Sequence, residues 1–504
     1  MIFLGDYLLR NAAEYPDRIA VIQDDRALTY RELNTECSCL ANSLRDLGLS
    51  SGDRLAVLMR NSIEWLLIFY ACQKLGVGVT LVHARLMPDE ILRTIELAQA
   101  DTLVYSPDFA DKAGYIDAHS KTLKNIILFG TGLNEPLPAG HYSFDRLMRG
   151  ENAAEAQIPL DGAQAGVILF TSGTTSASKG IVRTQEMMSA YASLLEDEDS
   201  LLAHDTMLTP SPLYHAAGLC CVVKMLVNAG TLVLLSRFDP EKICREIERC
   251  GATQLTLVPP TSYQRLKASG FPDRYDLSSV KLIHITAGRA GKDCLEDLFS
   301  MFPEAKLRLT WGSTEASNVT CAFLTHRQLL EKPQLLGTVG KINRLAEMRL
   351  YARDGSCVEG EGDGEAWVRS PLVFSGYINA PELTEQSFSD GWYKTEDILH
   401  RDAEGYYYLR DRKRDIIKTG GENVYAQEIE QAILAHPAVS ECAVIGVPDP
   451  QFGEAVAAAV VLKDGRTLEA GEFIDFCRTV LPSFKKPKYW AVLDALPKND
   501  FGKV

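Results

Sequence analysis

The chain has 504 residues, of which 46 % are hydrophobic and 24 % are charged, so it carries enough apolar material for large cores. Because a typical domain has about 150 residues, roughly three globular units are expected. Acidic residues outnumber basic ones and give a net charge of −15, which argues against nucleic acid or an anionic membrane as a partner.

Strand-like and helical patterns alternate along the first part of the chain. Residues 1–12 are interpreted as a first amphipathic helix, because they have neither a basic leader nor a small-residue cleavage site. Strand-like runs follow at 19–22, 54–58, 102–105, 124–128, 231–235 and 281–285, and helical patterns lie at 29–47 and 63–75. This alternation predicts an α/β fold with mostly parallel sheets.

The pattern changes near residue 337 to short strands with Gly and Asp turns, for example at 348–351 and 364–369. After the charged run 410–415 a small α/β pattern begins, and exposed charged links of this kind usually join domains. The sequence therefore predicts a large N-terminal domain over 1–411, whose parallel α/β subdomains are followed by a β-rich subdomain at about 337–411. A small mobile C-terminal α/β lid domain is predicted over 412–504.

Cysteine usage and hydropathy bear on the location of the protein. The twelve cysteines include no CxxC pair, which is typical of buried thiols in a reducing compartment. The most apolar stretch, residues 63–75, is shorter than the ~20 apolar residues of a membrane span. We expect a soluble cytoplasmic protein without integral membrane association.

A loop rich in hydroxyls and glycines lies at residues 169–181 (Leu-Phe-Thr-Ser-Gly-Thr-Thr-Ser-Ala-Ser-Lys-Gly-Ile), after a strand-like run. Hydroxyls and backbone N–H groups can wrap a polyphosphate, and Lys179 adds a point charge. The loop is not a Walker motif, because Ser178 and Gly180 flank the lysine. Taken without other motifs, such a segment is more often a solvated linker than a phosphate-binding loop.

This loop resembles the signature loop of the adenylate-forming superfamily, which includes acyl-CoA synthetases, nonribosomal-peptide adenylation domains and beetle luciferases. It departs from the usual pattern at Ser176, where the family has glycine, and at Ser178, where it has proline. Further segments resemble family motifs in the family's order, at 212–218, 310–315, 391–397, 411–424 and 496–503. On these motifs, which span nearly the whole chain, the protein is identified as a member of the superfamily.

The resemblance implies an ATP-dependent acid–CoA ligase. Such an enzyme forms an acyl adenylate and pyrophosphate, and then an acyl-CoA thioester and AMP. The implied cofactors and partners are ATP, Mg²⁺, coenzyme A as co-substrate and a small carboxylic acid, and a homodimer is left open. Residues 484–488 (Phe-Lys-Lys-Pro-Lys) resemble the segment with which aryl-CoA ligases of the 4-chlorobenzoate type hold the nucleotide of coenzyme A. The C-terminal third as a whole is closer to CoA ligases than to carrier-loading domains.

The resemblance also assigns the nucleotide and metal ligands. Glu315 corresponds to the Mg²⁺ ligand, although a solvated carboxylate after a turn is the plainer alternative. Asp397 suits both ribose hydroxyls because a carboxylate accepts two hydrogen bonds; the alternative for this residue is a turn cap. The Trp311 indole can stack on adenine, and ordinary core packing is its alternative. The implied ATP- and AMP-binding residues are Thr171, Ser172, Gly173, Thr174, Thr175, Lys179, Gly288, Trp311, Gly312, Thr314, Asp397 and Arg412.

Catalysis is assigned to Lys503, Glu315 and His215. The resemblance implies that Lys503 bridges the reacting carboxylate and the α-phosphate, whereas a lysine beside a chain end is otherwise disordered. Arg414 corresponds to the hinge about which the lid rotates between the two half-reactions. Coenzyme A is assigned to Gly420, Gly421, Phe484, Lys486 and Lys488, for which a bland turn and a solvated basic loop are the alternatives.

The acyl pocket is assigned by position in the family motifs. Its lining is small and neutral and has no acidic residue to pair with a substrate amine, which disfavours α-amino acids. An aromatic, alicyclic or medium-chain carboxylic acid fits this lining. For His215, the alternative is a histidine that packs in the protein core. The assigned residues are His215, Ala216, Ala217, Ala287, Thr310, Gly312, Ser317 and Asn318.

Other functions remain open at this level. A stand-alone adenylation enzyme could load the acyl group onto a carrier protein, and a luciferase-like oxidation could follow adenylation. A non-catalytic nucleotide-binding relative is compatible with Ser176 and Ser178, whereas a P-loop kinase is disfavoured by the context of Lys179. Dependence of the reaction on a thiol separates the first of these from the CoA ligase.

Overall fold

The structure is a computed structural model. It describes residues 1–129, 137–150, 152–155, 158–171, 179–198, 205–258, 260–286, 290–419, 422–450 and 453–498. The chain divides into two compact units: unit 1 comprises Met1–Glu331, Ile342–Glu347 and Arg369–Tyr393, and unit 2 comprises Lys332–Lys341, Met348–Val368 and Lys394–Val504. The domain boundary expected between residues 411 and 412 falls within unit 2 and stays a prediction.

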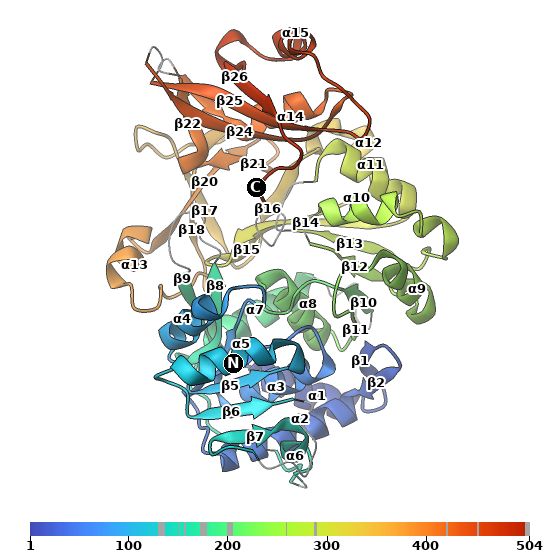
Figure 1. The fold of residues 1–504 in the computed structure, drawn as a ribbon, viewed down its shortest axis with the longest axis vertical. Coiled ribbons are helices and arrows are strands. Elements are labelled where there is room, and N and C mark those ends of the chain that lie inside the picture. The colour runs from blue at the N-terminus through green and yellow to red at the C-terminus, as the bar shows by residue number, and fades with distance from the viewer. Residues whose placement is uncertain are drawn as a thin grey trace. The chain divides into compact units, whose positions relative to one another are not determined.

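One sheet of unit 1 has seven strands in the order β7-β6-β5-β3-β4-β8-β9 (Figure 1). Neighbouring strands are parallel except for β8 and β9, which pair antiparallel. The strands are β3 Arg54–Leu58, β4 Gly78–Leu81, β5 Thr102–Tyr105, β6 Asn125–Leu128, β7 His141–Ser143, β8 Ala165–Thr171 and β9 Lys179–Thr184. The predicted parallel α/β arrangement is confirmed here.

A second group of strands in unit 1 follows the order β15-β14-β13-β12-β10-β11-β1-β2. Its interior pairs are parallel, whereas β2 and β15 pair antiparallel with their neighbours. The strands are β1 Ile19–Gln23, β2 Arg26–Thr29, β10 Thr206–Thr209, β11 Thr231–Leu234, β12 Gln254–Thr256, β13 Leu282–Ile285, β14 Lys306–Ser313 and β15 Ser317–Leu324.

Some helices of unit 1 begin at a residue whose side chain caps them. Thr29 caps α2: its side chain accepts the Glu32 N–H, and the Glu32 carboxylate accepts the Thr29 N–H at 2.8 Å. The helices, with the short strand β19, are α1 Leu4–Glu14, α2 Tyr30–Asp46, α3 Ile63–Leu75, α4 Pro88–Ala98, α5 Ala110–His119, α6 Phe144–Leu147, α7 Gln185–Glu198, α8 Ala216–Val227, α9 Pro240–Cys250, α10 Thr261–Ala268, α11 Lys292–Met301, α12 His326–Glu331, α13 Pro381–Ser387 and β19 Phe388–Ser389.

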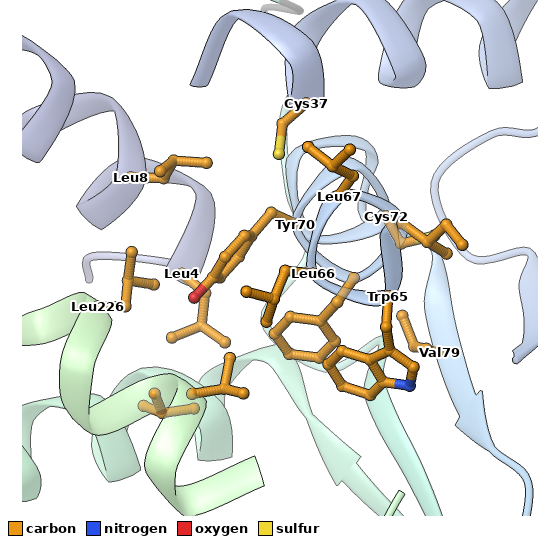
Figure 2. Close-up of a cluster of buried hydrophobic side chains, with 14 of the residues drawn as sticks. Leu4, Leu8, Cys37, Trp65, Leu66, Leu67, Tyr70, Cys72, Val79 and Leu226 are labelled. Atoms are coloured by element: carbon orange, nitrogen blue, oxygen red, sulfur yellow. The ribbon is translucent and has the colours of Figure 1, made fainter. Parts of the chain in front are cut away.

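The hydrophobic core of unit 1 surrounds α3, which is buried along nearly its whole length. The Trp65 and Phe69 rings stack with their centroids 5.2 Å apart. Figure 2 shows Leu4 of α1 and Leu226 of α8 facing the Tyr70 side chain. Burying one such side chain is worth about 1.5–3 kcal/mol, so the apolar stretch that is too short to span a membrane stabilises the interior instead.

Unit 2 contains the strand-rich and small α/β patterns expected after residue 337. One group of strands has the order β17-β18-β20-β21-β16, and a second has the order β23-β22-β25-β24 with β26 beside β25. Helix α14 packs on β24. The elements are β16 Thr338–Ile342, β17 Glu347–Tyr351, β18 Gly362–Arg369, β20 Trp392–Arg401, β21 Tyr407–Arg412, β22 Ile416–Thr419, β23 Glu422–Tyr425, α14 Ala426–Leu434, β24 Val439–Asp449, β25 Gly453–Leu462, α15 Ala470–Val480 and β26 Tyr489–Val492.

Glu430 of α14 is a titratable group inside unit 2. Burial raises its pKa to about 7, and the charges of Asp411 and Asp415 add to this effect. The Glu430 carboxyl accepts the Val444 N–H at 2.9 Å. Because the pKa lies above that of the unfolded chain, this group stabilises the fold most below the unfolded pKa, and its contribution is lost as the pH rises through about 7.

Glu430→Gln is therefore expected to gain stability relative to the wild type as the pH rises, because glutamine cannot become charged. The expected gain between about pH 5.5 and about pH 8.5 is roughly 1–3 kcal/mol. Thermal unfolding at both pH values measures it. The exposed Glu359 of the same unit offers the control Glu359→Gln, and a Glu430→Gln difference that does not change with pH contradicts the prediction.

None of the twelve cysteines forms a disulfide in the described chain, and Cys357 is exposed. Six of them are buried, at positions 37, 72, 221, 244, 294 and 477. Among the described helices, none combines the length and apolar character that crossing a membrane requires. The cytoplasmic location and the homodimer stay predictions.

Candidate active site

The predicted phosphate loop connects two paired strands of unit 1. Thr171 at the end of β8 is the register partner of Lys179 at the start of β9. The two ends of the loop are therefore held side by side by the sheet. The assigned residues Ser172, Gly173, Thr174 and Thr175 lie outside the described residues, and only the backbone of Thr171 is described.

Lys179 and Glu315 are linked through Tyr377. The Lys179 Nζ lies over the Tyr377 ring, 5.3 Å from its centroid. The Tyr377 hydroxyl donates a hydrogen bond to Glu315 Oε1 at 3.2 Å. An isolated bridge between Ile181 and Tyr377, together with the Ile378 N–H donating to the Gly180 carbonyl at 2.9 Å, holds the tyrosine segment against β9. The predicted phosphate-binding lysine and the predicted metal ligand therefore both contact the Tyr377 side chain.

The turn between β14 and β15 carries Glu315 and is held from two sides. Arg183 of β9 donates from Nη2 to the Thr314 carbonyl at 3.1 Å, and the Phe374 N–H donates to the Glu315 carbonyl at 2.7 Å. Burial lowers the pKa of Arg183, whereas Tyr191, Cys220 and Glu315 raise it, in that order. The Glu315 carboxylate is half-buried, so it is fixed in place and still reachable from solvent.

Gly312 and Trp311 precede this turn, where the β14–β15 pairing has an irregular register. A Cβ on Gly312 would lie 1.7 Å from the Ser317 carbonyl oxygen, so the strands approach too closely for any side chain. Ser317 has φ +56, and its hydroxyl donates to the Leu372 carbonyl at 3.3 Å. Trp311 is buried in the sheet.

The predicted acyl-pocket residues lie in two places in unit 1. His215 caps α8, and its Nδ1 accepts the Ala217 N–H at 3.2 Å. Asn318 of β15 donates from Nδ2 to the Tyr191 hydroxyl at 3.5 Å. Ala216 lies at the start of α8, and Thr310, Gly312 and Ser317 belong to β14 and β15. Ala287 and Gly288 lie outside the described residues.

The predicted ribose ligands lie together in unit 2. Asp397 of β20 and Arg412 of β21 are register partners, and the Arg412 Nε lies 3.5 Å from Asp397 Oδ1. The Asp397 backbone N–H donates to the Thr395 hydroxyl at 3.1 Å. Arg414, the predicted hinge, belongs to the short 3-10 helix Lys413–Asp415 between β21 and β22. Lys503 lies outside the described residues.

The predicted coenzyme A residues are only partly described. Gly420 and Gly421 lie outside the described residues, between the antiparallel strands β22 and β23. The Phe484 side chain is exposed, and Lys486 follows the 3-10 helix Ser483–Lys485. Lys488 forms an ion pair with the fully buried carboxylate of Asp449. Its hydrogen bond to that carboxylate raises the pKa of Lys488.

A cavity of about 700 Å³ lies elsewhere in unit 1. It is lined by Met59, Arg60, Ser62, Glu64, Ser106, Pro107, Asp108, Phe129, Ser236, Arg237, Asp239 and Lys242. No predicted site residue belongs to this set. The cavity is therefore not part of the candidate active site.

Two family models match the chain in the order that the motifs predict. The model described as "AMP-binding enzyme" matches residues 8–378, and the model described as "AMP-binding enzyme C-terminal domain" matches residues 428–503. The first match alone covers more than half of the 504 residues. The chain belongs to the AMP-binding enzyme family.

Several relatives of this AMP-binding enzyme align over 99 % of its length. A feruloyl-CoA synthase from Amycolatopsis sp is 31 % identical and 97 % covered, and the long-chain-fatty-acid–CoA ligase FadD13 from Mycobacterium tuberculosis is 29 % identical and 96 % covered. The o-succinylbenzoate CoA synthetase MenE from Bacillus subtilis, solved with its acyl-adenylate intermediate, matches with a TM-score of 0.84 at 29 % identity and 96 % coverage. A second MenE structure contains ATP and magnesium. These relationships place the chain among AMP-forming acid–thiol ligases.

The motifs did not reveal every residue that builds the site of this AMP-binding enzyme. Tyr377 joins Lys179 to Glu315, and Arg183 holds the turn that carries Glu315. Tyr377 lies between two predicted motifs, so no motif identified it. The sequence signal that could have identified Arg183 is a charged residue directly after the apolar Ile181 and Val182.

Proposed function

We propose that the chain activates an aromatic, alicyclic or medium-chain carboxylic acid. It would form the acyl adenylate with release of pyrophosphate, and then transfer the acyl group to coenzyme A with release of AMP. The observation that carries the proposal is the contact of Lys179 and Glu315 with Tyr377 in unit 1. This places a cation and a carboxylate together at the base of a hydroxyl-rich loop, as polyphosphate binding with a metal requires.

Adenylation joins two anions, because a carboxylate oxygen attacks the α-phosphorus and pyrophosphate leaves. The repulsion must be neutralised and the reactants must be oriented. Lys179 would bind the β- and γ-phosphates together with Thr171, Ser172, Gly173, Thr174 and Thr175. A bound Mg²⁺ supplies further positive charge, and Glu315 would hold it: its half-buried carboxylate is a hard oxygen ligand of the kind that Mg²⁺ uses beside phosphates.

The remaining nucleotide and catalytic assignments are part of the same proposal. Asp397, fixed by Arg412 and by the Thr395 hydroxyl, would accept hydrogen bonds from the ribose hydroxyls. Trp311, Gly312, Thr314 and Gly288 would contact the rest of the nucleotide. Lys503 would bridge the reacting carboxylate and the α-phosphate, and His215 would flank the channel through which the acid enters.

The proposed acid class follows from the small neutral residues at the predicted pocket and from the range of the relatives. Feruloyl-CoA synthase and the 2-succinylbenzoate ligases are named for aromatic acids, and FadD13 is named for long-chain fatty acids. Thr310, Ser317 and Asn318 offer hydroxyls and an amide without charge. An acid of moderate size, as in aryl-CoA ligases of the 4-chlorobenzoate type, is therefore proposed.

Coenzyme A is the proposed acceptor, and the C-terminal segment is its proposed binding site. Phe484 is exposed and offers a ring for stacking, and Gly420 and Gly421 would let the pantetheine arm pass close to the backbone. Because Asp449 already holds Lys488, Lys486 is the stronger candidate for a phosphate ligand. Rotation about Arg414 would present the lid domain for the second half-reaction.

The test is the formation of AMP and pyrophosphate from ATP with benzoates, alicyclic acids and short- to medium-chain fatty acids, each with and without coenzyme A. We expect one acid class to turn over and to yield its CoA thioester only when coenzyme A is present. Pyrophosphate release without thioester would instead indicate a carrier protein as acceptor. No AMP from any acid would contradict the proposed function.

A further inference from the structure

The cavity of about 700 Å³ in unit 1 contains none of the predicted site residues. Its volume lies within the ~300–1,000 Å³ that small-molecule sites occupy in proteins. Arginine side chains, serine hydroxyls and the Phe129 ring all contribute to its wall. A cavity of this size and lining is a candidate for a second ligand site in the chain.

The cavity lies at a position in the seven-stranded sheet that is typical of ligand sites. The chain runs from β3 to β4 on one side of β3 and then crosses to β5 on the other side, so the strand order reverses between β3 and β5. Because β3 is parallel to both neighbours, the carboxyl ends of these strands share one edge. Open α/β sheets bind ligands in the crevice outside the carboxyl ends at such a switch point.

The lining residues come from segments that directly follow the strand ends. Arg60 and Ser62 follow β3, and residues 106–108 follow β5. From the second group of strands, residues 236–237 follow β11. The predicted phosphate loop instead connects β8 and β9 at one edge of the sheet. The switch point between β3 and β5 is therefore not used by the candidate active site.

Asn61 holds two walls of the cavity together. This buried residue lies between Arg60 and Ser62, and its Nδ2 donates to the Ser211 carbonyl at 2.8 Å and to the Leu235 carbonyl at 3.1 Å. Leu235 directly precedes the lining residues that follow β11. The loop after β3 and the loop after β11 are thus fixed against each other, as in the largely preformed sites that bind small molecules.

The carboxylates on the cavity wall are already engaged. Asp108 accepts a hydrogen bond from the Arg60 Nε at 2.7 Å, and Glu64 forms an ion pair with Arg26. Asp239 caps α9 by accepting a backbone N–H of the first turn at 3.1 Å. A ligand in the cavity therefore meets few free acceptor groups.

Two arginine side chains on the wall keep free donor groups. Arg237 is exposed and forms no hydrogen bond or ion pair with the described residues. Arg60 uses its Nε for Asp108, whereas its two terminal nitrogens have no hydrogen-bond partner in the described part of the chain, and its side chain is 52 % exposed. The hydroxyls of Ser62 and Ser236 add further donors. The ligand that complements this wall is rich in acceptor oxygens.

We propose that the cavity binds a small organic phosphate of the phosphate-monoester class. Its three terminal oxygens can accept hydrogen bonds from Arg60 and Arg237 at once. A carboxylate has only two oxygens, and a single guanidinium fork occupies both of them. The Ser62 and Ser236 hydroxyls would donate to the same phosphate, and the Phe129 ring would contact the organic part. The proposal is independent of the proposed function, because the two sites share no residue.

The first experiment measures the binding of phenyl phosphate to the full chain by isothermal titration calorimetry. The phosphate of this probe can reach the arginines while its ring contacts Phe129, and we expect a dissociation constant of about 1 mM or tighter. Methyl phenyl phosphate is the matched comparator, because this diester has only two free terminal oxygens. It should bind about 10-fold more weakly, and inorganic phosphate, which lacks the ring, should bind more weakly too. Equal affinity for the three compounds overturns the proposal.

The second experiment assigns the binding to the cavity. Arg237→Met and Arg60→Met should each weaken phenyl phosphate binding by about 10-fold or more. Arg237→Lys keeps the charge but removes the planar fork, so an intermediate loss is expected. Arg274→Met, at an exposed position of unit 1 outside the cavity, is the matched control and should bind like the wild type. Thermal unfolding of each variant verifies that it is folded.

Lys179→Met distinguishes the cavity from the predicted phosphate loop. This variant should bind phenyl phosphate as the wild type does, because Lys179 lies outside the cavity. Loss of binding in Lys179→Met, together with unchanged binding in Arg237→Met, would place the probe on the loop and overturn the proposal. Absence of phenyl phosphate binding to the wild type overturns it as well. Neither result affects the proposed function, which is tested by AMP formation.

Discussion

Glu315→Gln is expected to lower kcat/KM for adenylate formation by about 10²- to 10³-fold, the magnitude seen when one group that stabilises transition-state charge is removed. Glutamine keeps the size of the side chain but removes the negative charge that would hold Mg²⁺ beside the phosphates. The backbone of the turn stays held by Arg183 and Phe374. Pyrophosphate release at several Mg²⁺ concentrations measures the effect, and the Mg²⁺ requirement should rise.

Tyr377→Phe provides a graded companion to this variant. It removes only the hydroxyl that donates to Glu315 and leaves the ring under Lys179, so a loss of roughly 10-fold is expected. Glu304→Gln, at an exposed position in the same unit, is the matched control and should behave like the wild type. A Glu315→Gln enzyme with wild-type kcat/KM and Mg²⁺ dependence would remove Glu315 from the site.

Local sequence signals located individual elements well. The runs 54–58 and 63–75 were predicted as a strand and a helix, and β3 and α3 have those bounds. Both are predominantly apolar runs that are buried almost throughout, so their lengths, rather than a side-chain period, distinguish the strand from the helix. The order of the strands in the sheets was not accessible in this way: β1 pairs with β11 about two hundred residues later along the chain, and a local pattern carries no information about its partner.

In the candidate site, too, some residues were predicted from the sequence and others became evident only in the structure. Lys179 and Glu315 were predicted because each lies in a recognisable motif. Tyr377, which contacts both, was missed because its role arises from the bridge to Ile181, a contact between segments far apart in the chain. Motifs therefore identified the charged groups of the site, and the structure supplied the side chain that connects them.

Two lysines illustrate why charge along a sequence is a weak guide to role. Lys488 was predicted to contact coenzyme A as part of a basic run, and this stays a prediction; the structure shows that Lys488 forms an ion pair with the buried Asp449. Lys224, within an otherwise apolar helix, attracted no prediction and is almost fully buried. In both cases the residues that decide the environment of the ammonium group lie on other elements, so the sequence around the lysine could not reveal it.

Gly312→Ala is expected to have the largest structural effect of the single substitutions considered for unit 1. The added Cβ would lie 1.7 Å from the Ser317 carbonyl oxygen and 2.8 Å from its carbonyl carbon. The obstacle is backbone, so no side-chain rotation relieves it, and β14 and β15 would have to separate beside the turn that carries Glu315. We expect a cost of about 3 kcal/mol or more and a thermal midpoint lower by roughly 5 °C or more.

The control for this substitution is Gly114→Ala, because a Cβ on Gly114 of α5 meets no atom within 4 Å. Alanine is the better helix former, so this variant should gain about 0.5–1 kcal/mol. Thermal unfolding and AMP formation should be measured on both proteins. A Gly312→Ala enzyme with the wild-type midpoint and activity would show that the β14–β15 pairing is not as tight as the structure has it, and would remove the steric argument for glycine beside the predicted nucleotide site.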